Sequence, residues 1–347
     1  MVLSDLLTKP AHSIINQSFD SRLRLDMRNP INGDGFGVGY YVSTSDGRDS
    51  NDPCVFKAIT PAWNNVNLNN LSRCTQSKLV FAHVRALTQG VLSESNCHPF
   101  FYGKIMFMHN GGVSGFNNIK KQLITHIDNQ FFMLIQGSTD SECCFALFLD
   151  TLYRMGYNPS DSTVKFSHKI LRTALLKTIA ILKDYQLSFT TEPSLLNFAV
   201  TDGESVVVSR YVSLKTDEAA SLYFSTGSKF FEYEPGHFKM ERLNRSQNVV
   251  FILSEPLTFE RGDWITVPTN TILTITKSNT VLMHPIKDEF YDLNIERSSG
   301  LAMSKGLIGG VPIKTDDPHI SMSNIDSDLD SSVPPLAREG RTTLPVN

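Results

Sequence analysis

The order in which hydrophobic periodicity changes along the chain is the feature that most constrains its fold. Strand-like segments, rich in β-branched and aromatic residues, cover residues 36–42, 79–84 and 104–108. Two helical segments follow, at 139–156 and 167–185, where apolar residues recur at three- and four-residue spacing. Strand-like segments then return at 195–200, 206–212, 222–225, 249–253, 272–276 and 281–284. Strands, then helices, then strands predict a layered α+β domain.

Two element boundaries carry residues with specific local roles. Thr139 and Glu142 have the spacing of a capping box, in which both side chains accept hydrogen bonds from backbone N–H groups of the first helical turn. Gly156 supplies the stop signal of the same helix. Residues 201–204, Thr-Asp-Gly-Glu, predict a hairpin turn between two strands.

Charge and hydropathy exclude several classes of partner. The net charge of −3 gives no field that would hold a polyanion, so nucleic acid is not expected as a partner. The longest apolar run, residues 143–149, is far shorter than the roughly 20 residues that span a bilayer, so no membrane contact is expected. The N-terminal residues lack the basic and apolar regions of a signal peptide, which predicts a cytoplasmic protein.

The five cysteines do not indicate a disulfide framework or a zinc site. Their number is odd and no Cys-x-x-Cys pair occurs. Cys143 and Cys144 are helical neighbours that point about 100° apart, so we interpret both as small core residues. Nothing in the sequence predicts a metal ligand set or a cofactor.

Composition divides the chain near residue 313. Residues 1–313 carry the strand and helix patterns and are predicted to form one domain. Residues 314–347 are rich in Asp, Ser and Pro and poor in apolar residues, which predicts a disordered acidic tail.

Alternating glycines at positions 33, 35, 37 and 39 first suggest a nucleotide-binding loop. We reject that interpretation, because the third glycine does not fit the GxGxxG spacing and a strand rather than a helix follows. Glycines at alternate positions of a strand clear one face of side chains. They therefore predict close approach of another backbone, a helix or a ligand.

Three polar positions stand out, each with a structural alternative. Arg85 ends an apolar strand; it either pairs with a surface acid or binds a carboxylate through two parallel hydrogen bonds. Asn110 and Gly111 lie in His-Asn-Gly-Gly, which is either a tight turn or a pair of donors for an oxyanion hole. Asp140 opens a helix, where it either complements the helix dipole or holds a substrate ammonium.

The order of these motifs is more specific than any one of them. The chain carries, in sequence, His83-x-Arg85, Asn96-x-His98-Pro99, His109-Asn110-Gly111 and Thr139-Asp140-Ser141-Glu142. This order resembles the glutaminase domain of class II glutamine amidotransferases, which are N-terminal nucleophile hydrolases. The distinctive segments 59–65, 136–142 and 259–264 make it most similar to the fungal subfamily whose amidotransferase subunit degrades glutathione.

The resemblance implies a four-layer αββα sandwich and a set of roles. Arg85 would hold the α-carboxylate of a glutamyl group and Asp140 its α-amino group. The Asn110 side-chain amide and the Gly111 N–H would stabilise the tetrahedral oxyanion. Thr88 would lie on the loop that covers the substrate. No metal or cofactor is implied for this chain.

The family's nucleophile is a cysteine that becomes the first residue after Met removal, with its own α-amino group as the base. Val2 stands at that position here, and the short strand that carries the cysteine in the family has no counterpart before Leu3. We therefore expect the first strand and its cysteine to be missing. A sequence lacking its true first segment is favoured over an evolved inactive form, because Arg85, Asn110, Gly111 and Asp140 are all present.

Three functions remain open at this stage. The favoured one is hydrolysis of γ-glutamyl bonds, with glutathione split into glutamate and Cys-Gly, in a complex with a peptidase-like subunit that carries its own metal. The second is a non-catalytic subunit that binds a γ-glutamyl ligand or acts as a scaffold. The third is glutamine-dependent amide transfer, although no acceptor domain follows residue 313. Whether this chain is itself an enzyme stays undecided.

Overall fold

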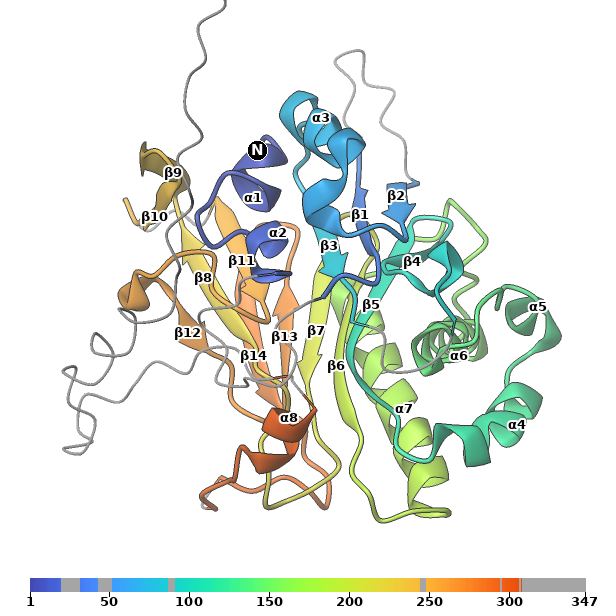
Figure 1. The fold of residues 1–347 in the computed structure, drawn as a ribbon. Helices are drawn as coiled ribbons and strands as arrows, with labels where there is room; N and C mark the ends of the chain where they lie inside the picture. Colours follow the sequence, from blue (N-terminus) through green and yellow to red (C-terminus); the bar gives the residue numbers. More distant parts are fainter. Residues whose placement is uncertain are drawn as a thin grey trace, which may run out of the picture. The chain divides into compact units, whose positions relative to one another are not determined.

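The computed structural model describes residues 1–19, 32–42, 52–86, 91–243, 248–293, 295–305 and 307 (Figure 1). The helices are α1 (Ser4–Leu7), α2 (Ile14–Gln17), α3 (Val66–Cys74), α4 (Phe116–His126), α5 (Asn129–Phe132), α6 (Asp140–Arg154), α7 (His168–Leu187) and α8 (Gly300–Ser304). Short 3₁₀ turns are η1 (Ala62–Asn64), η2 (Glu94–Asn96) and η3 (Arg261–Asp263). The strands are β1 (Phe36–Tyr40), β2 (Cys54–Ala58), β3 (Val80–Val84), β4 (Phe100–Tyr102), β5 (Ile105–Gly112), β6 (Leu195–Thr201), β7 (Val206–Arg210), β8 (Tyr223–Gly227), β9 (Lys229–Glu234), β10 (His237–Glu241), β11 (Val249–Leu253), β12 (Ile265–Thr266), β13 (Thr271–Ile275) and β14 (Val281–Pro285).

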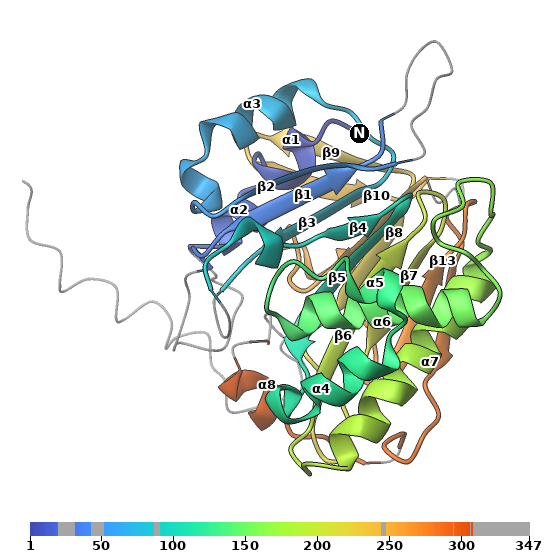
Figure 2. The ribbon, with the colours of Figure 1, turned by 90° about the vertical axis from the view of Figure 1, so that its right-hand side faces the viewer.

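The largest sheet is antiparallel and six-stranded, in the order β14-β13-β7-β6-β5-β4. Helices cover one of its faces. α6 and α7 lie along this face, and α4 and α5 flank α6 (Figure 2). The largest hydrophobic core fills this interface and includes Phe107 and Phe198 of the sheet and Phe148 of α6. Because α6 packs between the sheet and other helices, all residues from Ser141 to Leu152 are buried.

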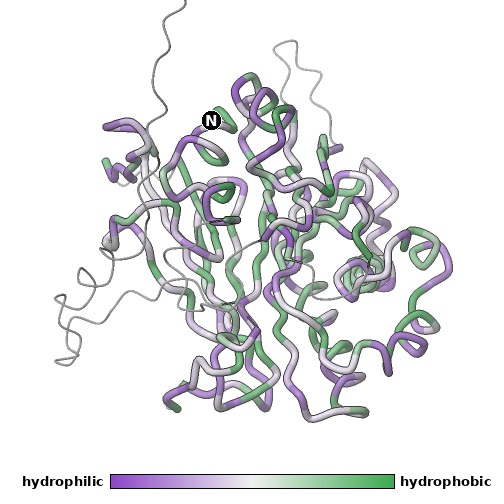
Figure 3. The backbone as a smooth tube through the Cα atoms, in the orientation of Figure 1, coloured by the Kyte–Doolittle hydropathy of each residue, from purple (hydrophilic) through white to green (hydrophobic). Residues whose placement is uncertain are grey.

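Two three-stranded sheets, β2-β1-β3 and β11-β8-β12, form the second β layer. A core that joins Val208 and Leu273 of the six-stranded sheet to Leu222 and Val267 holds the two β layers together. A further core packs β1 and β3 against α1 and α3. The layers therefore run helix, sheet, sheet, helix, as the αββα expectation required, and hydrophobic residues concentrate along the strands (Figure 3).

The alternating glycines of β1 allow the two β layers to approach closely. A Cβ on Gly37 would collide with the carbonyl oxygen of His98, and a Cβ on Gly39 would collide with the side chains of Met106 and Pro99. The prediction that these glycines clear one face of the strand is confirmed. What approaches is the chain entering β4 and β5, and no ligand is needed to explain the pattern.

The predicted helices and the β6–β7 hairpin are confirmed, with a refinement at the helix cap. The Thr139 hydroxyl accepts from the Glu142 N–H at 3.4 Å, as a capping box requires. The Glu142 carboxylate instead accepts from the N–H groups of Gln136 and Gly137, at 2.9 and 2.6 Å, and so fixes the segment before the cap. Gly203 adopts φ +89° in the hairpin turn.

The sequence patterns missed several elements. β2, the polar helix α3 and the β9–β10 hairpin were not predicted, and the predicted strand at 104–108 continues to Gly112. His-Asn-Gly-Gly is therefore strand and not a tight turn. Cys143 and Cys144 are core residues, as predicted, and all five cysteines are free thiols.

In the part of the chain that the structure describes, no helix is both long and apolar enough to cross a bilayer. Thr88 and the predicted tail, residues 314–347, lie outside the described residues.

Candidate active site

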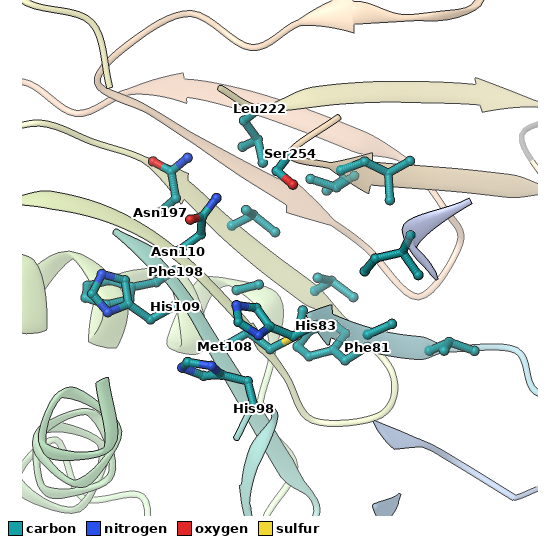
Figure 4. A pocket seen from close by; sticks show the side chains of 18 of the residues that line it. Phe81, His83, His98, Met108, His109, Asn110, Asn197, Phe198, Leu222 and Ser254 are labelled. Atoms are coloured by element: carbon teal, nitrogen blue, oxygen red, sulfur yellow. The ribbon is translucent and has the colours of Figure 1, made fainter. Parts of the chain in front are cut away.

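β5 presents the two predicted oxyanion donors. Side chains alternate along this strand, so Met108 and Asn110 face the second β layer while His109 faces the other way (Figure 4). Phe107 packs in the core beneath the helices. Within the described residues no hydrogen bond engages the Asn110 amide, which leaves it available to a ligand. Gly111 adopts φ +140°, and a Cβ there would collide with the Leu195 carbonyl oxygen, so only glycine fits.

Arg85 directly follows β3, and its backbone is fixed on both sides. Its N–H donates to the Gly35 carbonyl at 2.9 Å, and its carbonyl accepts from the Asp34 N–H at 3.0 Å. The side chain is 5% exposed. The glycine-rich segment ahead of β1 therefore sets the position of the Arg85 backbone.

Asp140 is the first residue of α6, and both of its carboxylate oxygens are used to position it. One oxygen accepts from the Val113 N–H at 2.8 Å, and the other accepts from the Ser141 N–H at 2.8 Å. The carboxylate thus ties the start of α6 to the residue after β5. It also lies at a helix N-terminus, where the dipole favours negative charge.

These four predicted residues line one cavity of about 1620 Å³ between the β layers. Figure 4 shows Asn110 in it. Arg85 comes from the end of β3, Asn110 and Gly111 from β5, and Asp140 from α6. The far wall includes β11 and the residues that follow it. The structure therefore brings together all the predicted site residues that it describes. The remaining predicted residue, Thr88, lies outside the described residues.

Three histidines line the same wall of the cavity: His98 and His109, which are buried, and His83, which is partly buried. Burial lowers the pKa of His83 to about 4, and the neighbouring His109 and Arg85 act in the same direction. Burial also lowers the pKa of His98 well below its usual value, with His83 adding to the effect. The ring centroids of His83 and His98 lie 4.4 Å apart. These imidazoles are therefore neutral at pH 7, and the positive charges beside them are those of Lys57 and Arg85.

None of the five cysteines lines this cavity. Cys97 comes nearest in sequence to the lining residues, but it is fully buried. Burial raises the pKa of its thiol, against the opposing effect of Arg85 and Lys57. Cys97 is therefore a protonated structural thiol. Among the described residues, no group of three His, Cys, Asp or Glu side chains is arranged to hold a metal ion.

Sequence reasoning missed further groups in the cavity wall. His109 was quoted only as part of a motif, yet its ring bonds to Ser141 and to the Leu195 carbonyl. Asn197 pairs with Asn110 across β5 and β6 and also lines the cavity. Strand alternation could have placed His109 on the helix side, but the partner residues come from α6 and β6, which no local pattern connects to it.

Comparison with known proteins decides the family. Residues 3–294 match the model of glutamine amidotransferases class-II. The chain belongs to this family. A relative from Saccharomyces cerevisiae, named probable glutamine amidotransferase DUG3, is 57% identical over 351 residues, covering 99% of this chain and 94% of that protein.

A solved structure supports the assignment. The glutamine aminotransferase class-II domain protein from Silicibacter pomeroyi is 26% identical with a TM-score of 0.51, covering 74% of this chain and 92% of that chain. The expected αββα fold of this amidotransferase family is therefore confirmed. The individual roles of Arg85, Asn110, Gly111, Asp140 and Thr88 stay predictions.

Proposed function

We propose that this amidotransferase chain builds the γ-glutamyl site of an amidohydrolase that splits glutathione into glutamate and Cys-Gly. The observation that carries the proposal is the convergence of Arg85, Asn110, Gly111 and Asp140 on one cavity. Glutathione rather than glutamine is proposed from the resemblance to the glutathione-degrading subfamily, because the two substrates share the same α-amino acid end.

The charges in the cavity suit the glutamyl end of such a substrate. The Arg85 guanidinium can bind the α-carboxylate through two parallel hydrogen bonds. Asp140, whose oxygens are already oriented by Val113 and Ser141, can accept a hydrogen bond from the α-ammonium. Opposite charges at two fixed points select an α-amino acid and leave the γ-carbonyl to the oxyanion donors Asn110 and Gly111.

The reaction also needs a nucleophile, for which the cavity has a strand-shaped space. β3 pairs only with β1 and β11 only with β8 among the described strands, so each presents its other edge to the cavity. Unpaired strand edges bind a further strand through backbone hydrogen bonds. We propose that an extended segment bearing a cysteine lies between β3 and β11 in the active protein.

With that thiol in place, the chemistry has two steps. The thiolate attacks the γ-carbonyl, the oxyanion is held by Asn110 and Gly111, and Cys-Gly leaves as its amine takes a proton. Water then hydrolyses the γ-glutamyl thioester, which releases glutamate and restores the thiol. The free cysteines of the chain fit a reducing compartment, and we propose the cytoplasm. We also propose a peptidase-like metalloprotein as partner subunit, which copurification of the natural protein would test.

The test uses the protein from its natural source. Incubation with glutathione should release glutamate and Cys-Gly in equal amounts, and mass spectrometry should find an N-terminal peptide beginning with cysteine. Asn110→Ala should lower kcat about 10² to 10³-fold with little change in KM. Asn70→Ala, an exposed amide on α3, is the matched control.

A second function is favoured by the absence of any of the five cysteines from the cavity lining. A non-catalytic subunit would bind γ-glutamyl compounds without turnover. Saturable binding with no glutamate release by the natural protein would establish this reading. Release of ammonia from glutamine, with glutathione untouched, would instead support amide transfer.

A further inference from the structure

A series of contacts at hydrogen-bonding distance links the start of α6 to β6 along one wall of the cavity. The Asp140 carboxylate lies 3.3 Å from the Ser141 hydroxyl oxygen. That hydroxyl lies 2.9 Å from Nδ1 of His109. Nε2 of His109 lies 3.0 Å from the Leu195 carbonyl oxygen. Ser141 and His109 line the cavity but are only 7% and 3% exposed, so little water reaches these contacts.

The end of this series of contacts touches the oxyanion donor. The carbonyl oxygen of Leu195 occupies the place where a side chain of Gly111 would be. The His109 hydrogen bond therefore fixes the carbonyl against which the Gly111 backbone rests. At its other end, Asp140 accepts from the Val113 N–H, two residues beyond Gly111. The same stretch of β5 is held from both ends of the series of contacts.

The proton positions follow from donor and acceptor chemistry. A carbonyl oxygen only accepts, so Nε2 of His109 carries a hydrogen in every state. When the ring is neutral, Nδ1 accepts from the Ser141 hydroxyl. When the ring is protonated, Nδ1 donates to the Ser141 oxygen, and the hydroxyl hydrogen turns to Asp140. The orientation of the Ser141 hydroxyl thus depends on the charges of His109 and Asp140.

We propose that Ser141 and His109 are positioning residues that couple occupation of the α-amino site at Asp140 to the geometry of the oxyanion hole at Gly111. This coupling rests on the proposed γ-glutamyl site. A bound ammonium engages the Asp140 carboxylate, so the Ser141 hydroxyl donates to Nδ1 of the neutral His109 ring instead of to Asp140. This donation polarises the Nε2–H and strengthens its hydrogen bond to the Leu195 carbonyl. The substrate's own α-amino group thereby helps to order the donors that act on its γ-carbonyl.

The surroundings of His109 suit a group that stays neutral but responds to Asp140. Burial lowers the pKa of the ring, whereas Asp140 and the Leu195 carbonyl raise it. The other ionisable groups facing the ring are His83 of β3 and His98 ahead of β4, both kept neutral by burial. Phe198 of β6 covers one side at 4.6 Å between ring centroids. Asp140 is therefore the charge whose neutralisation changes the ring most.

The experiment follows the His109 ring by ¹⁵N NMR in the full chain labelled at histidine. Saturation with L-glutamate or glutathione should move the His109 titration to lower pH, and so should Asp140→Asn without ligand. Ser141→Ala should reduce both shifts to less than half, while Ser141→Thr, which retains the hydroxyl, should preserve them. Ser72→Ala is the control, because it removes a buried helical hydroxyl whose partner among the described residues is the Leu68 carbonyl.

Hydrolysis by the natural protein supplies a second readout. Ser141→Ala should lower kcat about tenfold with less effect on KM, because the oxyanion donors act in the transition state. Ser141→Thr should restore kcat. If Ser141 had only a structural role, Ser141→Ala would lower stability but would not lower kcat more than it changes KM.

The outcomes separate the two proposals. If ligand binds but the His109 titration does not move, or if Ser141→Ala leaves the shift intact, the coupling is wrong and the γ-glutamyl site stands. If no γ-glutamyl compound binds, the proposed function fails, and the Asp140→Asn titration alone then decides whether the series of contacts transmits charge. An unshifted titration in Asp140→Asn overturns the coupling.

Discussion

The backbone N–H of Val113 donates to the Asp140 carboxylate at 2.8 Å, which joins the end of β5 to the first residue of α6. The residue proposed to bind the substrate amine therefore also holds the strand that carries the oxyanion donors. One side chain fixes the distance between two subsites that must contact the same glutamyl group. This geometry explains why the site depends on a helix start and a strand end that are far apart in sequence.

Asp140→Asn removes the negative charge of the side chain but keeps its shape and one oxygen that can accept from the Val113 N–H. Loss of the carboxylate should weaken binding of γ-glutamyl compounds about 10²-fold or more, since hydrogen-bonded ion pairs in buried sites are the strong ones. Isothermal titration calorimetry measures the affinity. Asp161→Asn, at an exposed turn, should change nothing. Equal affinity in Asp140→Asn would remove this residue from the ligand site.

Gly37→Ala should destabilise the fold by about 3 kcal/mol, because the new methyl group overlaps the His98 carbonyl and neither backbone can move away easily. Urea unfolding followed by circular dichroism gives the free energy. Gly262→Ala is the matched control, since a Cβ there meets no atom within 4 Å. A similar small effect in both variants would contradict the close packing of β1 on the β4–β5 region.

Acidification should destabilise the folded chain through His83. Its pKa is about 4 in the folded state and about 6.5 when unfolded, so the unfolded chain binds more protons between these values. Stability contributed by this neutral ring is full above pH 6.5 and is lost as pH falls toward 4. His83→Gln should flatten the pH dependence of the unfolding free energy, whereas His237→Gln, on an exposed face, should leave it unchanged.

Glu142→Ala should cost about 2 to 4 kcal/mol of stability, because it leaves the N–H groups of Gln136 and Gly137 without their acceptor. The segment before α6 would then lose its anchor, and Asp140 would be displaced. Glu142→Gln keeps one acceptor oxygen and should recover part of the loss. Thermal unfolding should rank wild type as most stable, Glu142→Gln next and Glu142→Ala last. Equal stabilities of Glu142→Ala and wild type would contradict this prediction.

The sequence predicted those parts of the fold that depend on neighbouring residues. The helix begun by Thr139 and the hairpin at Gly203 follow from capping and turn chemistry, and both are confirmed. α3 was missed because its mostly polar sequence is held by packing of Leu68 against α1 and β1, a contact between distant segments. The β9–β10 hairpin was missed although residues 237–241 alternate polar and apolar side chains and residues 235–236, Pro-Gly, are a turn signal.

In the candidate site, too, some residues could be predicted from the sequence and others could not. Arg85, Asn110, Gly111 and Asp140 were proposed from motif order, and the structure gathers them. The link from Ser141 through His109 to Leu195 joins three elements, so no local pattern could predict it. The reason for the glycines at 37 and 39 also needed the structure, because only the fold shows which chain passes over them.

Binding of modified glutathiones tests the central claim most directly. Glutathione, its N-acetyl derivative and its glutamyl α-methyl ester would be titrated into wild-type protein and into Arg85→Ala. Wild type should bind glutathione and lose about 10²-fold or more with either modification. Arg85→Ala should no longer distinguish the ester but should still reject the N-acetyl form. Equal binding of all three ligands to wild type would contradict a γ-glutamyl site built on Arg85 and Asp140.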